Sequence, residues 1–96
     1  MTKEYIYTEK APSAIGAYSQ AVKFNGIVYL SGQIPLDPKT MILISSDIEI
    51  QIEQVFINLS HVLNASGSSL DEILKLNVYL TNLENFSKVN EHMEKI

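Results

Sequence analysis

The chain has 96 residues, of which 46% are hydrophobic and 19% are charged, and its formal net charge is −4. Its basic side chains are seven scattered lysines, without any arginine, which excludes the concentrated positive patch that a nucleic-acid-binding surface needs. Cysteine is absent, and this excludes disulfides, thiolate metal sites and a cysteine nucleophile.

The same numbers predict one folded domain over residues 1–96, because the hydrophobic content is that of a globular protein. No apolar run approaches the roughly 18 residues of a membrane span. The N-terminal residues lack the apolar core of a secretion signal. We therefore expect a cytoplasmic protein with neither a membrane nor a nucleic acid as partner.

Residues 3–8 alternate weakly and predict a short first strand, and residues 9–16 follow as a loop. The dipeptide Asn25-Gly26 then separates two runs of strand-type residues. Asn-Gly is the strongest short-range hairpin signal, because a type I′ turn needs positive φ at both central residues. We therefore expect the residues on either side of this dipeptide, 17–24 and 27–33, to pair as an antiparallel hairpin.

A two-residue turn fixes which side chains of the hairpin face each other. The expected pairs are Phe24–Ile27, Val22–Tyr29, Gln20–Ser31 and Tyr18–Gln33. This face changes from apolar at the turn to hydroxyl- and amide-bearing at the open end, whereas the opposite face suits packing against a helix. Gly32 interrupts the second strand, which indicates either a plain bulge or a place where another molecule approaches the backbone closely.

Residues 46–65 are predicted to form the main helix, since their apolar side chains recur at helical spacing. Those side chains are Ile48, Ile52, Val55, Phe56, Leu59, Val62 and Leu63. Ser46 and Glu49 have the spacing of a capping box, and Gly67 is expected to end the helix in a left-handed conformation. His61 is predicted to be a packed or rim histidine, because no other ligand-type residue has metal-binding spacing to it.

Residues 73–81 alternate between apolar and polar side chains, which predicts a half-buried strand. A second helix is expected to start near Asn82, with Thr81 and Glu84 as a capping box. Its predicted core face is formed by Leu83, Phe86, Val89, Met93 and Ile96. A helix, a strand and a helix in succession favour a sheet with both helices on one face.

Asn90 falls inside the apolar arc of this second helix, where an unbonded amide costs about 1–3 kcal/mol of desolvation. Two interpretations stay open at this point. The amide is either a packing group bonded to a loop carbonyl or a side chain that shapes a pocket.

Two stretches resemble a known family. Residues 11–22, APSAIGAYSQAV, followed by residues 29–40, YLSGQIPLDPKT, closely resemble the start of the RidA family, the reactive-intermediate (enamine/imine) deaminases. Residues 76–91, LNVYLTNLENFSKVNE, resemble the same family's central strand and second helix. Family members often have glycine where this chain has Met41. Residues 1–96 do not contain the family's Pro-Ala-Arg segment or its later Val-Glu-Ile-Glu strand.

The resemblance implies an α+β fold of the chorismate-mutase-like (RidA) type, with a mixed β-sheet and two helices packed on one face. It implies a homotrimer with its sites in the clefts between subunits. An apolar-aromatic sheet face agrees with an interface, although further strands within one chain would also cover it. We expect residues 1–96 to be a single RidA-like domain that lacks the family's C-terminal strands.

The resemblance also implies an activity, the hydrolysis of 2-imino acids such as 2-iminobutanoate and 2-iminopropanoate to 2-oxo acids and ammonia. No cofactor and no metal is implied. Tyr18 and Ser31 match the family's catalytic positions, and Gly32 and Asn90 match its substrate-binding positions. The family anchors the substrate carboxylate with an arginine, which this chain does not have. The alternatives are therefore a non-catalytic module that binds small acids or a protein partner, and an inactive fragment.

Overall fold

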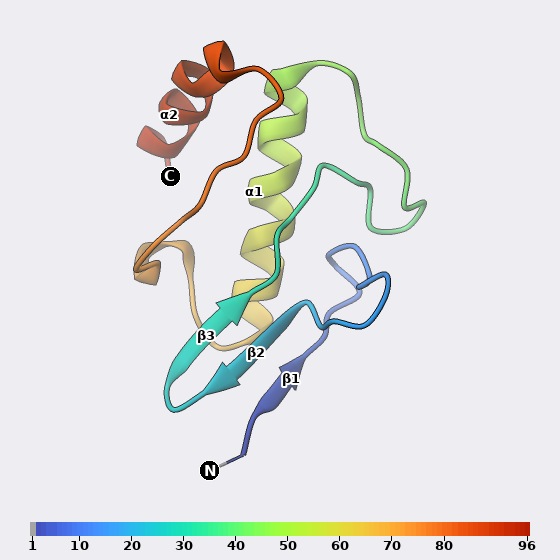
Figure 1. The fold of residues 1–96 in the computed structure, drawn as a ribbon, viewed down its shortest axis with the longest axis vertical. Coiled ribbons are helices and arrows are strands. Elements are labelled where there is room, and N and C mark those ends of the chain that lie inside the picture. The colour runs from blue at the N-terminus through green and yellow to red at the C-terminus, as the bar shows by residue number, and fades with distance from the viewer. Residues whose placement is uncertain (1) are drawn as a thin grey trace.

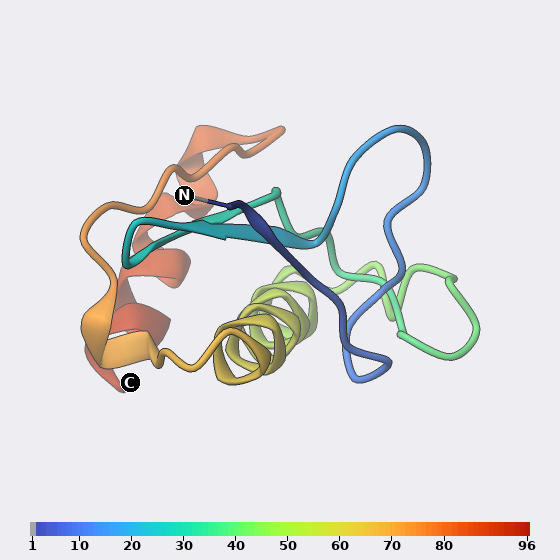
Figure 2. The ribbon, with the colours of Figure 1, turned by 90° about the horizontal axis from the view of Figure 1, so that it is seen from below.

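Three strands and two helices form the fold of residues 2–96, the part of the chain that this computed structural model describes. In chain order the elements are β1 (Glu4–Ile6), β2 (Ala21–Phe24), β3 (Ile27–Leu30), α1 (Ile48–Ala65) and α2 (Phe86–Glu94), with 3-10 turns at Leu70–Glu72 and Leu83–Asn85. The strands form one antiparallel sheet in the order β1-β2-β3. α1 lies under one face of this sheet (Figure 1, Figure 2) and contacts α2. The architecture is α+β, as predicted.

The predicted hairpin turn is confirmed. Asn25 has φ 55° and Gly26 has φ 79°, the two positive values that a type I′ turn requires. The register is also as predicted, with Phe24 opposite Ile27.

The paired strands are shorter than the predicted ranges 17–24 and 27–33. β2 begins at Ala21 and β3 ends at Leu30. One further pair continues the ladder, because the N–H of Ser31 donates to the carbonyl of Gln20 at 3.0 Å. The predicted Tyr18–Gln33 pair is not formed, since the chain has already left the sheet at both positions.

The α1 helix begins one residue later than the predicted capping box requires. The cap is Asp47, whose carboxylate accepts hydrogen bonds from the N–H groups of Glu49 at 2.8 Å and Ile50 at 3.4 Å. The predicted cap at Ser46 is therefore wrong. A carboxylate at this position also interacts favourably with the positive end of the helix dipole, which a serine hydroxyl does not.

The end of α1 is as predicted. Gly67 has φ 83°, and the N–H of Ser68 donates to the carbonyl of Leu63 at 2.9 Å. This is the hydrogen-bond pattern of a Schellman motif, in which a left-handed glycine turns the chain away from the helix.

Two clusters of buried side chains pack against α1, one on the side of the sheet and one on the side of α2. Under the sheet, Val62 packs with three buried side chains from the N-terminal part of the chain, namely Ile6, Ala11 and Ala21. Toward α2, four apolar side chains of α1 pack with Val89, namely Ile52, Phe56, Leu59 and Leu63. The ring of His92 also stacks on that of Phe56, with centroids 5.0 Å apart. α1 is therefore the element that joins the sheet to α2.

Residues 73–81 do not form the predicted strand. They form no regular element, and Leu74 and Tyr79 are each 89% exposed. Alternation stabilises a strand only when a neighbouring strand pairs with it, and no described strand does so here. The sheet of the described residues is consequently antiparallel rather than mixed.

The second helix also differs from its prediction at the start. A 3-10 turn precedes α2, and its cap is Asn82, whose side chain accepts from the N–H of Glu84 at 3.0 Å, so the predicted Thr81 box is wrong. Only Val89 of the predicted core face is fully buried, whereas Leu83 is 79% exposed. Because so little of α2 is covered, its apolar arc is not a true core face within residues 2–96.

The loop between β3 and α1 makes a tight turn at Asp37–Ile42. Leu36 and Leu43 form an isolated antiparallel bridge, and the N–H of Met41 donates to the carbonyl of Asp37 at 2.8 Å. Met41 has φ 60°, a left-handed conformation that a Cβ atom disfavours.

Candidate functional site

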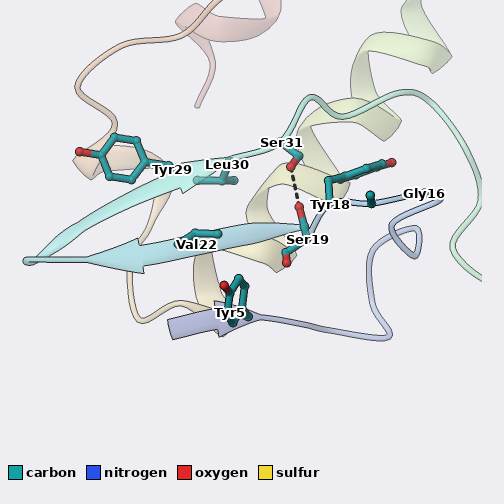
Figure 3. Close-up of a pocket in the computed structure, with 9 residues that line it drawn as sticks. Tyr5, Gly16, Tyr18, Ser19, Val22, Tyr29, Leu30 and Ser31 are labelled. Atoms are coloured by element: carbon teal, nitrogen blue, oxygen red, sulfur yellow. Dashed lines mark hydrogen bonds between the residues drawn. The ribbon is translucent and has the colours of Figure 1, made fainter. Parts of the chain in front are cut away.

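The open end of the hairpin carries a shallow pocket of about 570 Å³. Its walls come from β1, β2, β3 and the loop before β2, and are formed by Tyr5, Gly16, Ala17, Tyr18, Ser19, Val22, Tyr29, Leu30 and Ser31. Figure 3 shows Tyr18, Ser19 and Ser31 grouped at the end remote from the turn, with Tyr5 and Val22 further along the sheet. Two sequence-predicted site residues, Tyr18 and Ser31, therefore share one pocket.

Ser31 is held at both its backbone and its hydroxyl. Its N–H donates to the carbonyl of Gln20, and its Oγ donates a short hydrogen bond to the carbonyl of Ser19 (Figure 3). The hydroxyl proton is thus already used, and the lone pairs of Oγ stay available to accept. In this arrangement Ser31 is suited to accept a hydrogen bond from a bound N–H group or water.

Tyr18 lies just before β2, and its side chain is 53% exposed. Its phenol group is free to donate or accept, and its ring supplies apolar surface to the pocket. Tyr18 and Ser31 each bring a hydroxyl-bearing side chain to the lining of this pocket, and in Figure 3 the phenol oxygen of Tyr18 points away from Ser31.

Gln20 fixes the loop that leads to Tyr18. The Gln20 side chain is only 3% exposed. Its amide donates to the carbonyls of Thr8 at 3.0 Å, Ala11 at 3.3 Å and Pro12 at 2.8 Å, and its oxygen accepts from the N–H of Thr8 at 2.7 Å. Gln20 was predicted only to lie on the polar end of the hairpin, and this role was not predicted from the sequence.

Asn58 fixes the loop that follows Ser31 and Gly32. It is fully buried on α1, and its Nδ2 donates to the carbonyls of Ile34 at 3.2 Å and Leu36 at 3.1 Å. Its oxygen accepts from the amide of Gln54 at 2.8 Å. The role of Asn58 was not predicted from the sequence either, although an amide between Val55 and Leu59 on the apolar face of a helix is the available signal.

Gly32 borders the Tyr18 pocket without lining it, and it lies instead on a second groove. A Cβ atom added here meets nothing within 4 Å, so the packing of this chain does not itself demand glycine. Asn90 lines neither cavity. It is exposed on α2 and donates to Glu94 at 3.2 Å, so the interpretation as a buried packing amide is wrong.

Asp37 is a carboxylate near the site whose pKa is shifted by its surroundings. The pKa of Asp37 is held below its ordinary value, chiefly because its carboxylate accepts the N–H groups of Thr40 and Lys39 in the loop beyond Ser31. Within residues 2–96 no group of three or more metal-ligating side chains comes together. In the same range, neither helix has the length and apolar content for crossing a membrane.

Comparisons with known proteins agree with this fold. The architecture is that of a Rid-type α+β subunit. A family model described as endoribonuclease L-PSP matches residues 8–96, and the chain belongs to this family, which was predicted from the sequence as RidA.

Three similar proteins illustrate the relationship. A Rid-family protein of unknown function from Yersinia pestis is 49% identical, with a TM-score of 0.91 over 95% of this chain and 72% of that one. TdcF of E. coli, solved with bound serine, is 35% identical, with a TM-score of 0.89 over 96% of this chain and 72% of that one. The chloroplastic Reactive Intermediate Deaminase A of Arabidopsis thaliana is 45% identical over 93% of this chain and 48% of that relative. The two solved structures confirm the predicted fold.

Proposed function

We propose that the protein is an imine deaminase that converts 2-iminobutanoate and 2-iminopropanoate to 2-oxo acids and ammonia. The observation that carries the proposal is that Tyr18 and Ser31, two residues with hydroxyl groups, line the same pocket. The name of the Arabidopsis relative supports the reaction class, and the serine bound to TdcF supports a ligand the size of a small amino acid.

The reaction requires water and proton transfer only. The oxygen of water bonds to C2 of the imine and gives up a proton, the π electrons of the C=N bond move to nitrogen, and nitrogen takes a proton to give a neutral carbinolamine. Nitrogen then takes a second proton and leaves as ammonia while the C–OH group loses its proton and becomes the carbonyl. Water is the one co-reactant, and no electrons are transferred to a cofactor.

The two hydroxyls have complementary parts in this proposal. Ser31 accepts from the imine N–H or from the attacking water, because its own proton is bonded to Ser19. Tyr18 donates to the developing charge on the substrate. Gly32 offers close backbone approach beside Ser31, and Asn90 acts only in an assembled form, since it lies outside the pocket of its own chain.

The substrate carboxylate has no arginine to meet it in this chain. A bidentate arginine contact is worth about 2–5 kcal/mol, so we expect turnover roughly 30- to several-thousand-fold below that of relatives that have one. This observation favours a second candidate, a module on the same scaffold that binds small acids without turning them over.

An activity on RNA is not proposed, although the family's description contains the word endoribonuclease. The net charge of −4 opposes a phosphate backbone. The proposal includes a homotrimer in the cytoplasm, and the exposed aromatic side chains of the sheet support the assembly.

The test is an assay that generates 2-iminobutanoate in situ and measures the rate at which the 2-oxo acid forms, compared with the spontaneous rate. Tyr18→Phe and Ser31→Ala should each lower kcat/KM by about 10- to 1000-fold, because each removes a positioned hydroxyl. Tyr79→Phe is the matched control, since this tyrosine is exposed and outside the pocket. Equal activity of the parent, Tyr18→Phe and Ser31→Ala would remove both residues from the mechanism.

Two further variants separate the remaining roles. Gly32→Ala fits the fold without a clash, so a loss of activity in a fully stable variant indicates close substrate approach. Asn90→Ala should lower activity only if the assembled protein brings this amide to the site. If the parent protein does not exceed the spontaneous rate, its binding of 2-oxobutanoate is measured by titration. Saturable binding favours the binding module, and a lack of binding argues against it.

A further inference from the structure

Residues 12–20 form a loop that carries Tyr18, and its two ends lie together. Figure 2 shows it as the blue loop beyond the end of β2. The ends are joined by a hydrogen bond in which the side-chain amide of Gln20 donates to the carbonyl of Pro12 at 2.8 Å, and both residues are buried. A surface loop of this length with adjacent ends is an Ω-loop. The amide of Gln20 therefore closes the base of the loop.

The part of the loop between these ends has little to hold it. Within the described range 2–96, residues 13–18 make no hydrogen bond of their own. All of them except Ala14 are exposed. Few buried contacts and no backbone hydrogen bonds are the features of a segment that opens easily. The position of Tyr18 consequently depends on how firmly the base of the loop is closed.

The backbone at the same base holds Ser31. The carbonyl of Gln20 accepts the N–H of Ser31 at 3.0 Å, and the carbonyl of Ser19 accepts its Oγ–H. Both hydrogen-bond donors of Ser31 are thus bonded to residues 19–20. One residue, Gln20, therefore links the loop of Tyr18 through its side chain to the strand position of Ser31 through its backbone.

The surroundings of the Gln20 side chain select an amide. Its NH₂ group is shared among the carbonyls of Thr8, Ala11 and Pro12, and its oxygen accepts from the N–H of Thr8. A carboxylate has no proton to offer these carbonyls, and an apolar side chain would leave all of these partners unbonded. Of the side chains of this length, only an amide serves both kinds of partner.

We propose that Gln20 is a positioning residue of the deaminase site, which it serves by closing the Tyr18 loop beside Ser31. Gln20 does not line the pocket, so it acts through Tyr18 and not on the substrate. A misplacement of about 1 Å in a reacting group can cost about 100-fold in rate. The kinetic consequence rests on the proposed deaminase function, whereas the fixing of the loop does not.

The kinetic test is a double-mutant cycle. Gln20→Glu keeps the size and the acceptor but loses at least one donor, and it should lower kcat/KM for 2-iminobutanoate by about 10- to 100-fold. In a Tyr18→Phe background the same change should cost less than about threefold, because the phenol that the loop positions is already absent. A loss of folding alone would not depend on the presence of this phenol.

Gln51→Glu is the matched control. The amide of Gln51 also donates to a loop carbonyl, that of Ser45 at 2.7 Å, but it lies outside the Tyr18 pocket. This variant loses a comparable donor and should keep the activity of the parent in both backgrounds.

A second measurement reports on the loop without using activity. Backbone order parameters from ¹⁵N relaxation should lie near the rigid value of about 0.85 for residues 13–18 of the parent and fall below about 0.6 in Gln20→Glu. Those of residues 45–51 should not change. If Gln20→Glu does not fold, Pro12→Gly tests the base from its other end, because it keeps the carbonyl and releases the fixed φ. It should give the same kinetic and relaxation results.

Two results would overturn the proposal. One is an equal loss of kcat/KM in the parent and Tyr18→Phe backgrounds, because the effect of Gln20 would then not pass through Tyr18. The other is an unchanged set of order parameters for residues 13–18. A parent without deaminase activity would overturn the proposed function instead, and the order parameters would still decide whether Gln20 fixes the loop.

Discussion

At the scale of single residues, Met41 is the position where sequence and backbone conflict. Its φ of 60° places a side chain in the left-handed region, which costs about 1–2 kcal/mol for a residue with a Cβ atom. The turn forms nevertheless, because the Leu36–Leu43 bridge and the hydrogen bond to Asp37 hold the chain on both sides.

Met41→Gly should raise the free energy of unfolding by about 1 kcal/mol, since glycine adopts positive φ without strain. In a domain of this size that corresponds to a rise of about 4–8 °C in Tm. Met41→Ala is the control, because it removes the same side chain and keeps the strained Cβ. Equal stability of the glycine and alanine variants in urea unfolding would refute the strain argument.

Asp37 in the same turn predicts a pH dependence. Its carboxylate accepts the N–H groups of Lys39 at 2.8 Å and Thr40 at 3.0 Å, which lowers its pKa in the folded state. A lowered pKa means that the contribution to stability is complete above the unfolded pKa, near 4, and is lost as the pH falls through the folded pKa. Stability should therefore decline on the acid side of about pH 4.

Asp37→Asn should remove part of that acid decline, because an amide does not titrate. Urea midpoints at pH 5.5 and at two values below 4 measure it, and Asp71→Asn, an exposed aspartate in the Leu70–Glu72 turn, is the control. The same slope in parent and Asp37→Asn would show that other groups govern the acid side.

Asn58 gives a third prediction at this scale. Asn58→Leu fills the space but leaves the carbonyls of Ile34 and Leu36 without their donor, which should cost about 1–3 kcal/mol. Asn64→Leu, an exposed position on the same helix, should be nearly neutral. Urea unfolding measures both. Should Asn58→Leu be as stable as the parent, the two carbonyls do not depend on this amide.

At the scale of elements, a helix or strand was predictable where the residues that stabilise it lie close by in the sequence. It was not predictable where its stability depends on pairing with a strand far away along the chain. The hairpin follows from Asn25-Gly26, because both strands and the turn lie within a few residues. α1 follows from its apolar periodicity and the glycine behind it. Residues 73–81 have an equally clear alternation, but no strand of the described residues pairs with them.

The site shows the same division. Tyr18 and Ser31 were both predicted at the open end of the hairpin and line one pocket there, although the predicted Tyr18–Gln33 pair is not formed and their roles stay a prediction. The supporting amides, Gln20 and Asn58, were missed because their partners are 8 to 24 residues away along the chain. Periodicity placed Asn90 in the apolar arc of the second helix and left open whether it packs or shapes a pocket, and periodicity does not report how much of α2 is covered.

At the scale of the whole molecule, one face of the sheet is covered and the other is not. The pairing places Tyr5, Val22 and Tyr29 on one face, while their neighbours Ile6 and Ala21 are buried on the other, over α1. Tyr5 is 66% and Tyr29 60% exposed. An aromatic face of this kind on a small domain is typical of an interface, and the proposed homotrimer would cover it.

Tyr29→Glu should therefore weaken the assembly. Leaving an aromatic side chain out of an interface and introducing a charge costs about 1.5–3 kcal/mol, which raises the dissociation constant at least tenfold. Sedimentation at several protein concentrations measures the shift toward monomer. Tyr79→Glu is the matched control, because Tyr79 is 89% exposed and lies outside the three strands of the sheet. A parent that sediments as a monomer throughout, or a trimer that tolerates Tyr29→Glu unchanged, would mean that this face is not the interface and that its tyrosines serve the pocket alone.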